Sequence, residues 1–198
     1  PSSSRTIKYT PESLRHIGSE VEALISRHSS LKIHKQAIER QLVLIAARIH
    51  EEDVALIPRN IFLLLEMRGS GGVGEQLEQI ARLVLEEGYW KPRVRVQHYQ
   101  RQDVYYLGKS TQKLFDDYAV LDRRVERVHA RLGYIKQRQQ MKLETTPQGI
   151  FEGLATSSEY ASIQDEIEVI VDLLEHTDRP GWFRRLSVHR SSKKIWRA

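Results

Sequence analysis

An apolar stripe between residues 114 and 132 constrains the fold of this 198-residue chain most strongly. Its members recur alternately after four and three residues, and they are Leu114, Tyr118, Leu121, Val125, Val128 and Leu132. This spacing forms one apolar face along about five turns of α-helix. Gly133 follows, and a glycine at this place is typical of a helix end in the left-handed conformation. We therefore expect a long amphipathic helix that ends at Gly133.

The neighbouring stripe of this helix is mainly cationic, and a cationic region surrounds it. Residues 91–142 contain 13 Lys and Arg against 5 Asp and Glu, whereas residues 143–178 contain 9 Asp and Glu and no Lys or Arg. Because neutralisation of phosphates supplies much of a protein's affinity for DNA, the exposed face of this helix is predicted to bind DNA. The candidate DNA-binding residues are Lys113, Arg123, Arg124, Arg127, Arg131 and Lys142. The alternative interpretation is that these cations only solvate the helix.

The segments around the long helix have the serial order of a winged helix-turn-helix. Upstream, residues 101–107 are compatible with a short helix, and a break over residues 108–110 separates it from the long helix. Downstream, residues 142–146 and 150–154 flank Pro147-Gln148-Gly149, a sequence in which proline presets a turn dihedral and glycine permits positive φ. A β-hairpin, the wing, is expected there. The predicted fold class is mainly α with a small β-hairpin, a winged helix-turn-helix with additional flanking helices.

Four short elements follow one another within residues 97–155: Gln102-Asp103-Val104-Tyr105-Tyr106, Leu114-Phe115, Asp122-Arg123 and Gln148-Gly149-Ile150-Phe151-Glu152-Gly153. In this order and spacing they resemble the winged-helix domain of the topoisomerase VI A subunit and of the related meiotic double-strand-break transesterase. The resemblance implies that Tyr106 is a nucleophile that forms a phosphotyrosyl link to a DNA end, with Arg101 as the nearest residue to stabilise the phosphate. The family's metal-binding Toprim domain is not recognisable here. The resemblance therefore implies no cofactor in this chain and Mg²⁺ for the complete enzyme.

Two functions follow from these observations. The first is a DNA-cleaving transesterase module, and the second is a non-catalytic winged-helix regulator or chromosome-organising protein, in which Tyr105 and Tyr106 are only a core and a rim aromatic residue. Double-stranded DNA is the expected partner in both. The resemblance further implies a B-type topoisomerase-like subunit at the N-terminal helices, and the alternative is that these helices only pack onto the winged helix. A homodimer is also expected, with a nuclear location in a eukaryote or a cytoplasmic one otherwise. The longest apolar runs are far shorter than a bilayer span, so no membrane partner is expected.

The remainder of the chain is predicted to be helical around a glycine-rich connection. Helices are expected from about residue 11 to 27, 31 to 52, 60 to 67, 75 to 87 and 157 to 175, with a strand at 93–96. The glycine-rich connection lacks the Lys and Ser or Thr of a phosphate-binding loop, so it is taken as a linker. The predicted organisation is an N-terminal helical region (1–68), the linker (69–74), the winged helix (75–155), a C-terminal helix (156–178) and a basic tail (179–198).

No metal site is predicted. The acidic residues Asp165, Glu166, Glu168 and Asp172 fit the solvated face of an amphipathic helix, and the eight histidines lack the spacing of a zinc site. The chain also has no cysteine, which excludes disulfides and thiolate ligands.

Overall fold

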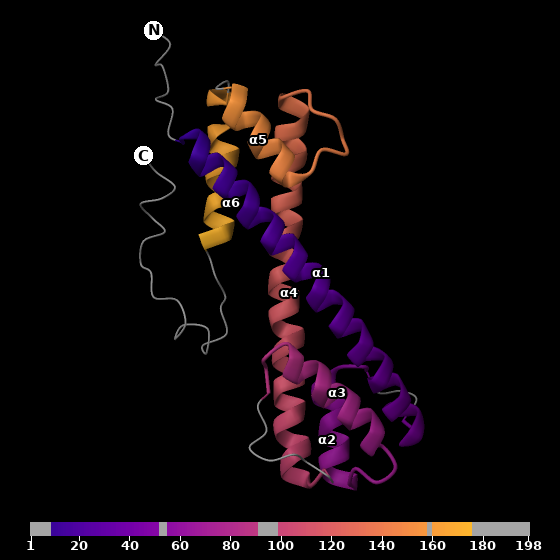
Figure 1. Ribbon diagram of the computed structural model, residues 1–198. Coiled ribbons are helices and arrows are strands. Elements are labelled where there is room, and N and C mark those ends of the chain that lie inside the picture. Colours follow the sequence, from indigo (N-terminus) through magenta and orange to yellow (C-terminus); the bar gives the residue numbers. More distant parts are fainter. Residues whose placement is uncertain (1–8, 52–54, 91–98, 158–159, 176–198) are drawn as a thin grey trace. The chain divides into compact units, whose positions relative to one another are not determined.

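The structure is a computed structural model that describes residues 9–51, 55–90, 99–157 and 160–175, and every regular element in these residues is a helix (Figure 1). The elements are α1 (Pro11–Arg48), α2 (Pro58–Arg68), α3 (Gly74–Glu86), α4 (Arg101–Arg138), α5 (Pro147–Ser157), the 3-10 turn η1 (Ala161–Ile163) and α6 (Gln164–Glu175). The mainly α prediction is confirmed. The strand predicted at 93–96 and the basic tail at 179–198 lie outside the described residues.

The chain divides into two compact units that do not follow its linear order. Unit 1 comprises Pro1–His28 and Leu121–Ala198, and unit 2 comprises Ser29–Val120. Both boundaries fall inside long helices, because α1 and α4 each contribute residues to both units. The units therefore differ from the consecutive segments predicted from the sequence.

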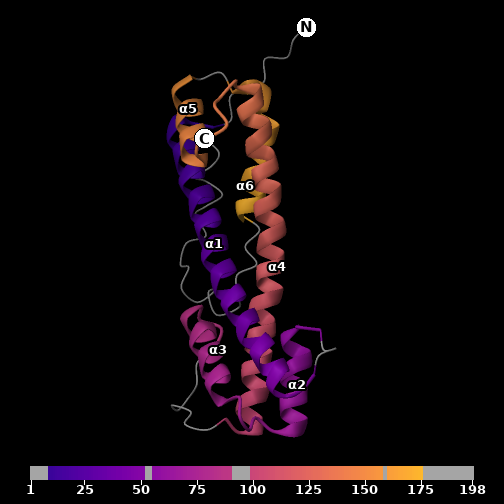
Figure 2. The same cartoon turned by 90° about the vertical axis from the view of Figure 1, so that its right-hand side faces the viewer.

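The core of unit 1 is made by the first half of α1, the second half of α4, and helices α5 and α6. In Figures 1 and 2, α5 and α6 lie beside these parts of the two long helices. The fully or almost fully buried side chains include Leu14, Ile17 and Val21 of α1, Val128 and Ile135 of α4, Ile150, Phe151 and Leu154 of α5, and Ile167 and Ile170 of α6. Their three- and four-residue spacings explain why these segments are amphipathic helices.

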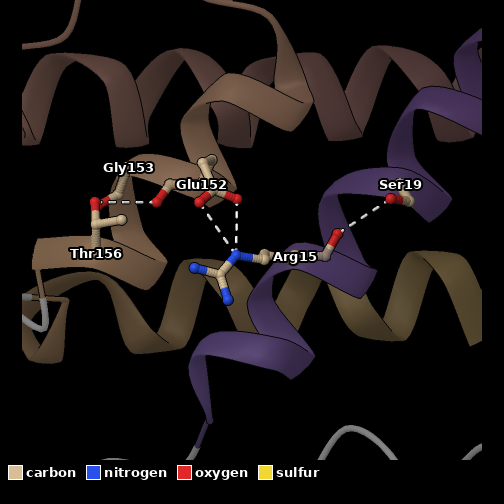
Figure 3. Close-up of polar contacts among 5 residues, drawn as sticks. All are labelled: Arg15, Ser19, Glu152, Gly153 and Thr156. Carbon is tan, nitrogen blue, oxygen red and sulfur yellow. Dashed lines mark hydrogen bonds and ion pairs between the residues drawn. The ribbon is translucent and has the colours of Figure 1, made fainter.

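Helices α1 and α5 approach closely in unit 1. A Cβ atom added to Gly18 would lie 2.9 Å from the Cβ of Phe151, so the missing side chain makes room for the aromatic residue. Nearby on the surface, the Arg15 Nε donates a hydrogen bond to the Glu152 Oε2 at 2.8 Å (Figure 3). The hydrogen bond and the negative charge of Glu152 raise the pKa of Arg15 above its usual value. Because both side chains are exposed, this ion pair contributes little to the free energy of unfolding.

Unit 2 is built from α2 and α3 together with the second half of α1 and the first half of α4. Its buried residues include Ile38, Leu42 and Ile45 of α1, Ile61, Phe62 and Leu65 of α2, Leu77, Ile80 and Val84 of α3, and Val104, Leu107 and Leu114 of α4. The glycine-rich segment ends where α3 begins at Gly74, and Arg48 donates a hydrogen bond to the Gly72 carbonyl at 2.6 Å.

The apolar stripe predicted on α4 is confirmed. Leu114, Leu121, Val125, Val128 and Leu132 are buried and Tyr118 is half-buried. The stripe continues beyond the predicted helix at both ends, with Val104 and Leu107 before it and Ile135 after it.

The helix-turn-helix predicted at residues 101–132 is wrong, because α4 is continuous through Gly108 and Gly133. Gly108 lies where α4 meets α2, and a Cβ atom there would be 2.6 Å from the Cβ of Phe62. Its function is therefore close packing and not a turn. The left-handed residue after α4 is Gln140, with φ of 53°, and the amide of Met141 donates to the Lys136 carbonyl at 2.9 Å. This is the hydrogen bond that commonly closes a helix of this kind.

The β-hairpin predicted at residues 142–154 is also wrong, because residues 147–157 form α5. The Thr146 hydroxyl accepts a hydrogen bond from the Gly149 amide at 3.1 Å, and its carbonyl accepts one from Ile150 at 2.9 Å. Thr146 is thus the N-cap of a helix with Pro147 as its first residue, a favoured place for proline. Without the hairpin and the break at Gly108, the described residues do not form a winged helix.

Two other helix boundaries differ from the predictions. The separate helices expected at 11–27 and 31–52 are the single helix α1, which passes through Ser29 and Ser30. The C-terminal helix begins at Gln164 and not at residue 157, which instead ends α5. Serine is only a weak helix breaker, so α1 continues through Ser29 and Ser30.

Candidate nucleic-acid interface

The second half of α4 presents a stripe of cationic and aromatic side chains on the surface of unit 1. We call it the α4 stripe, and its members are Arg123, Arg127, Arg131, Tyr134 and Arg138. All five are exposed. They recur every three or four residues, so they share one side of the helix over about 22 Å at 1.5 Å per residue. Three of the arginines are the predicted residues Arg123, Arg127 and Arg131.

The centre of the α4 stripe is hollowed. Arg127, Ala130, Arg131 and Tyr134 line an open hollow, and Glu166 of α6 forms its other wall. The Arg131 Nη1 donates to the Glu166 Oε2 at 2.8 Å, so this carboxylate already occupies one of the arginines.

Tyr134 and Arg138 are members of the stripe that the sequence interpretation missed. The Arg138 Nε donates to the Tyr134 hydroxyl at 2.9 Å, and the guanidinium carbon lies 5.4 Å from the ring centroid. They were missed because the helix was expected to end at Gly133. The spacing of the arginines, which is four residues from 123 to 131 and seven from 131 to 138, keeps Arg138 on the same side of a continued helix and could have indicated that the stripe extends past Gly133.

Arg124, a predicted DNA-binding residue, lies in a different setting. Its side chain is half-buried, and its Nε and Nη2 donate to the Leu173 carbonyl at 3.1 and 2.6 Å. Leu173 is in the last turn of α6, where carbonyl groups lack helical partners and the helix dipole favours a cation. Arg124 thus links α4 to the end of α6.

The other two predicted DNA-binding residues lie outside the α4 stripe. Lys113 is in unit 2, where its ammonium is 3.3 Å from the Asp117 carboxylate in an i, i+4 pair. Lys142 is exposed in the connection between α4 and α5, in unit 1. The structure therefore brings together three of the six predicted residues in one stripe.

The predicted catalytic residues Tyr106 and Arg101 both lie on the first turns of α4, in unit 2. Tyr106 is 50% exposed, and its ring packs edge to face against that of Tyr105 with centroids 5.3 Å apart. Arg101 precedes Tyr106 by five residues, which is about 140° around a helix, whereas it precedes Tyr105 by four, about 40°. Arg101 therefore shares a helix face with Tyr105 and not with Tyr106.

A third tyrosine close in sequence, Tyr99, is not a suitable nucleophile. Burial, together with the smaller effects of the nearby Glu78 and Asp103 carboxylates, raises its pKa to about 12. Its phenol consequently stays protonated near neutral pH. Its backbone carbonyl accepts a hydrogen bond from the Ser70 hydroxyl at 2.9 Å, which ties the start of α4 to the glycine-rich segment.

The described residues contain neither a cluster of metal ligands nor a membrane-spanning helix. Within residues 9–51, 55–90, 99–157 and 160–175, no three His, Asp or Glu side chains are grouped so that they could hold a metal ion. No helix in the same part of the chain is both long and apolar enough to cross a bilayer.

Comparison of the chain with protein families, with curated proteins and with solved structures gave no significant match.

Proposed function

We propose that this protein is a non-catalytic DNA-binding protein that contacts the phosphates of duplex DNA through the α4 stripe. The observation that carries the proposal is the recurrence of four exposed arginines along one side of a single helix. A guanidinium donates in a planar fork that matches phosphate oxygens, so arginine is well suited to this contact.

The dimensions of the stripe also support phosphate binding. Arginines four residues apart are about 6 Å apart along the helix axis. Duplex DNA carries one negative charge per roughly 1.7 Å of its axis, so the α4 stripe can lie against several phosphates at once. Contacts of this kind give affinity without base recognition, because base edges are read in the grooves.

A salt titration tests this proposal. Replacing Arg123, Arg127 and Arg138 together by Gln should weaken binding to a duplex of random sequence and reduce the slope of log K against log salt by about 3, since each phosphate contact contributes roughly 0.9. Arg131 and Arg124 are left unchanged because they bond to Glu166 and to the Leu173 carbonyl. Fluorescence anisotropy from about 50 to 200 mM salt gives the slope.

The matched control removes the same charge from unit 2. Arg40, Arg59 and Arg82 are exposed, and their joint replacement by Gln should leave the slope close to that of the unchanged protein. Equal losses in the two triple variants would mean that net charge and not the α4 stripe determines binding, and the proposal would be wrong.

A second candidate function is the phosphotyrosyl transesterase, favoured by one observation: the Tyr106 ring is half exposed and so accessible to a phosphodiester. If Tyr106 is the nucleophile, the chain with Mg²⁺ and a partner that supplies the metal site should leave protein attached to DNA ends. Tyr106→Phe should abolish the adduct and Tyr105→Phe should not. Gel analysis after protein denaturation detects the adduct, and its persistence in Tyr106→Phe would exclude this nucleophile.

A further inference from the structure

The first turns of α4 carry an aromatic and cationic surface that differs from the α4 stripe. Arg101, Tyr105 and Lys109 follow one another at intervals of four residues, with Tyr106 beside them. All four side chains are exposed, whereas Val104 and Leu107 on the other side of the helix are buried. The four residues lie within unit 2.

The two tyrosine rings are not stacked on each other. Their planes are inclined at 72° and their centroids are 5.3 Å apart, which is an edge-to-face pair. In such a pair the edge of one ring covers only one face of the other, so ring area remains for a further planar group. Exposing two adjacent tyrosines by 43% and 50% leaves apolar ring area in water, which binding of a planar ligand would bury.

Cations flank the rings at the spacing of helical turns. The Lys109 ammonium lies 5.5 Å from the Tyr105 centroid, and Arg101 precedes the same tyrosine by one turn. From Arg101 to Lys109 the sequence contains these two cations and a single acidic residue, Asp103. The Asp103 carboxylate accepts a hydrogen bond from the Gln100 amide at 3.0 Å, so it acts as a cap of α4.

We propose that Tyr105 and Tyr106, flanked by Arg101 and Lys109, form a second binding site that takes unpaired nucleobases of single-stranded nucleic acid. The rings stack on the bases while the cations hold the neighbouring phosphates, as in single-strand-binding proteins of many folds. A duplex hides its base faces within its own stack, so it does not satisfy this site. The charge and the aromatic area together favour this ligand over an apolar protein surface, which would leave Arg101 and Lys109 without counter-charges.

The test compares two ligands that have the same phosphates. Binding of a fluorescent oligothymidylate and of an abasic strand of equal length is measured by anisotropy at fixed salt. Because each stacked base contributes about fivefold or more to affinity, the unchanged protein should bind oligothymidylate at least about tenfold more tightly than the abasic strand. Equal affinities for the two strands, or no binding of either, would overturn the proposal.

Paired variants separate stacking from other roles of the tyrosines. Tyr105→Ala with Tyr106→Ala should remove the preference for bases, whereas Tyr105→Phe with Tyr106→Phe should keep it, because phenylalanine keeps the ring face and lacks only the hydroxyl. Circular dichroism confirms that both proteins retain their helices. A preference that persists in the Ala pair, or that the Phe pair also loses, would contradict stacking.

The same strands distinguish this site from the proposed duplex interface. The Arg123, Arg127 and Arg138 triple variant should keep its preference for oligothymidylate over the abasic strand even though its duplex binding is weakened. Loss of that preference in the triple variant would place base recognition on the α4 stripe, and the site at Tyr105 and Tyr106 would be excluded. Absence of duplex binding with an intact base preference would refute only the duplex proposal.

Discussion

Phe151→Ala is expected to lower the free energy of unfolding of unit 1 by about 3 to 5 kcal/mol, the usual cost of deleting a buried aromatic side chain. Phe151 is completely buried, and the Gly18 position of α1 lies directly against its Cβ. The surrounding helices cannot close the resulting cavity without moving α1 relative to α5. Urea unfolding followed by circular dichroism, with hydrogen exchange of the α5 amides, measures the loss.

Leu143→Ala is the control for this prediction. Leu143 also lies in the segment for which the sequence predicts a wing, but it is 87% exposed. Its truncation should therefore change the free energy of unfolding by less than about 0.5 kcal/mol. Similar small effects in both variants would show that α5 does not pack through Phe151.

Gly108→Ala is expected to destabilise unit 2, although alanine is the better helix former. The new Cβ would lie 2.6 Å from the Phe62 Cβ, a contact that forces α2 or α4 to shift. Overpacking of this kind costs about 1 to 3 kcal/mol, which exceeds the gain of up to about 1 kcal/mol from replacing a helical glycine. Thermal or urea unfolding of the purified variant checks the sign.

Gly133→Ala provides a matched control in the same helix. No atom lies within 4 Å of its added Cβ, so the variant should be more stable by about 0.5 to 1 kcal/mol. The two glycine substitutions are thus expected to have opposite signs. If both stabilise the protein, Gly108 is not a contact between α2 and α4.

The apolar face of each helix could be predicted from the sequence, because burial follows a period that is visible in the chain. The stripe from Leu114 to Leu132 is buried as expected except for the half-buried Tyr118, and Ile163, Ile167 and Ile170 near the C-terminal end of the described chain show the same period of burial. These positions depend only on the side of a helix that packs inward.

The ends of the helices could not be predicted so well, since one local sequence can serve two structures. The helix predicted from about residue 11 does begin there: Thr10 precedes Pro11, the first residue of α1, and the Ser13 amide donates to the Thr10 hydroxyl at 3.1 Å. Thr146-Pro147 is the same signal with the same capping bond, but the following Gly149 suggested a turn. The apolar spacing that follows determines whether Thr-Pro begins a helix or a turn, and here the spacing of Ile150, Phe151 and Leu154 is that of a helix.

Glycine was a poor guide to breaks in α4 for a related reason. Gly108 and Gly133 are helical, while the left-handed residues that follow α1 and α4 are His50 and Gln140. Gly108 packs against Phe62, which is distant in the sequence, and Gly133 faces open space within the helix, so neither glycine marks a break. The same error affects the candidate interface, because a helix that ends at Gly133 does not include Tyr134 and Arg138. The contact of Arg124 with the Leu173 carbonyl at the end of α6 could not be predicted, because it joins distant parts of the sequence.

In the sequence, the residues of unit 2 lie between the two parts of unit 1. This order determines which unit is completely synthesised first. Residues 29–120 form a continuous stretch, so every partner within unit 2 has been synthesised once Val120 has emerged. Unit 1 instead joins distant parts of the chain: Arg15 and Glu152 are separated by 137 residues, and Tyr9 and Tyr160 by 151. At about 5 to 20 residues per second, the first half of α1 remains for several seconds without its partners α5 and α6, so its apolar face stays uncovered. This half of α1 is therefore exposed to chaperones and to misassembly during translation.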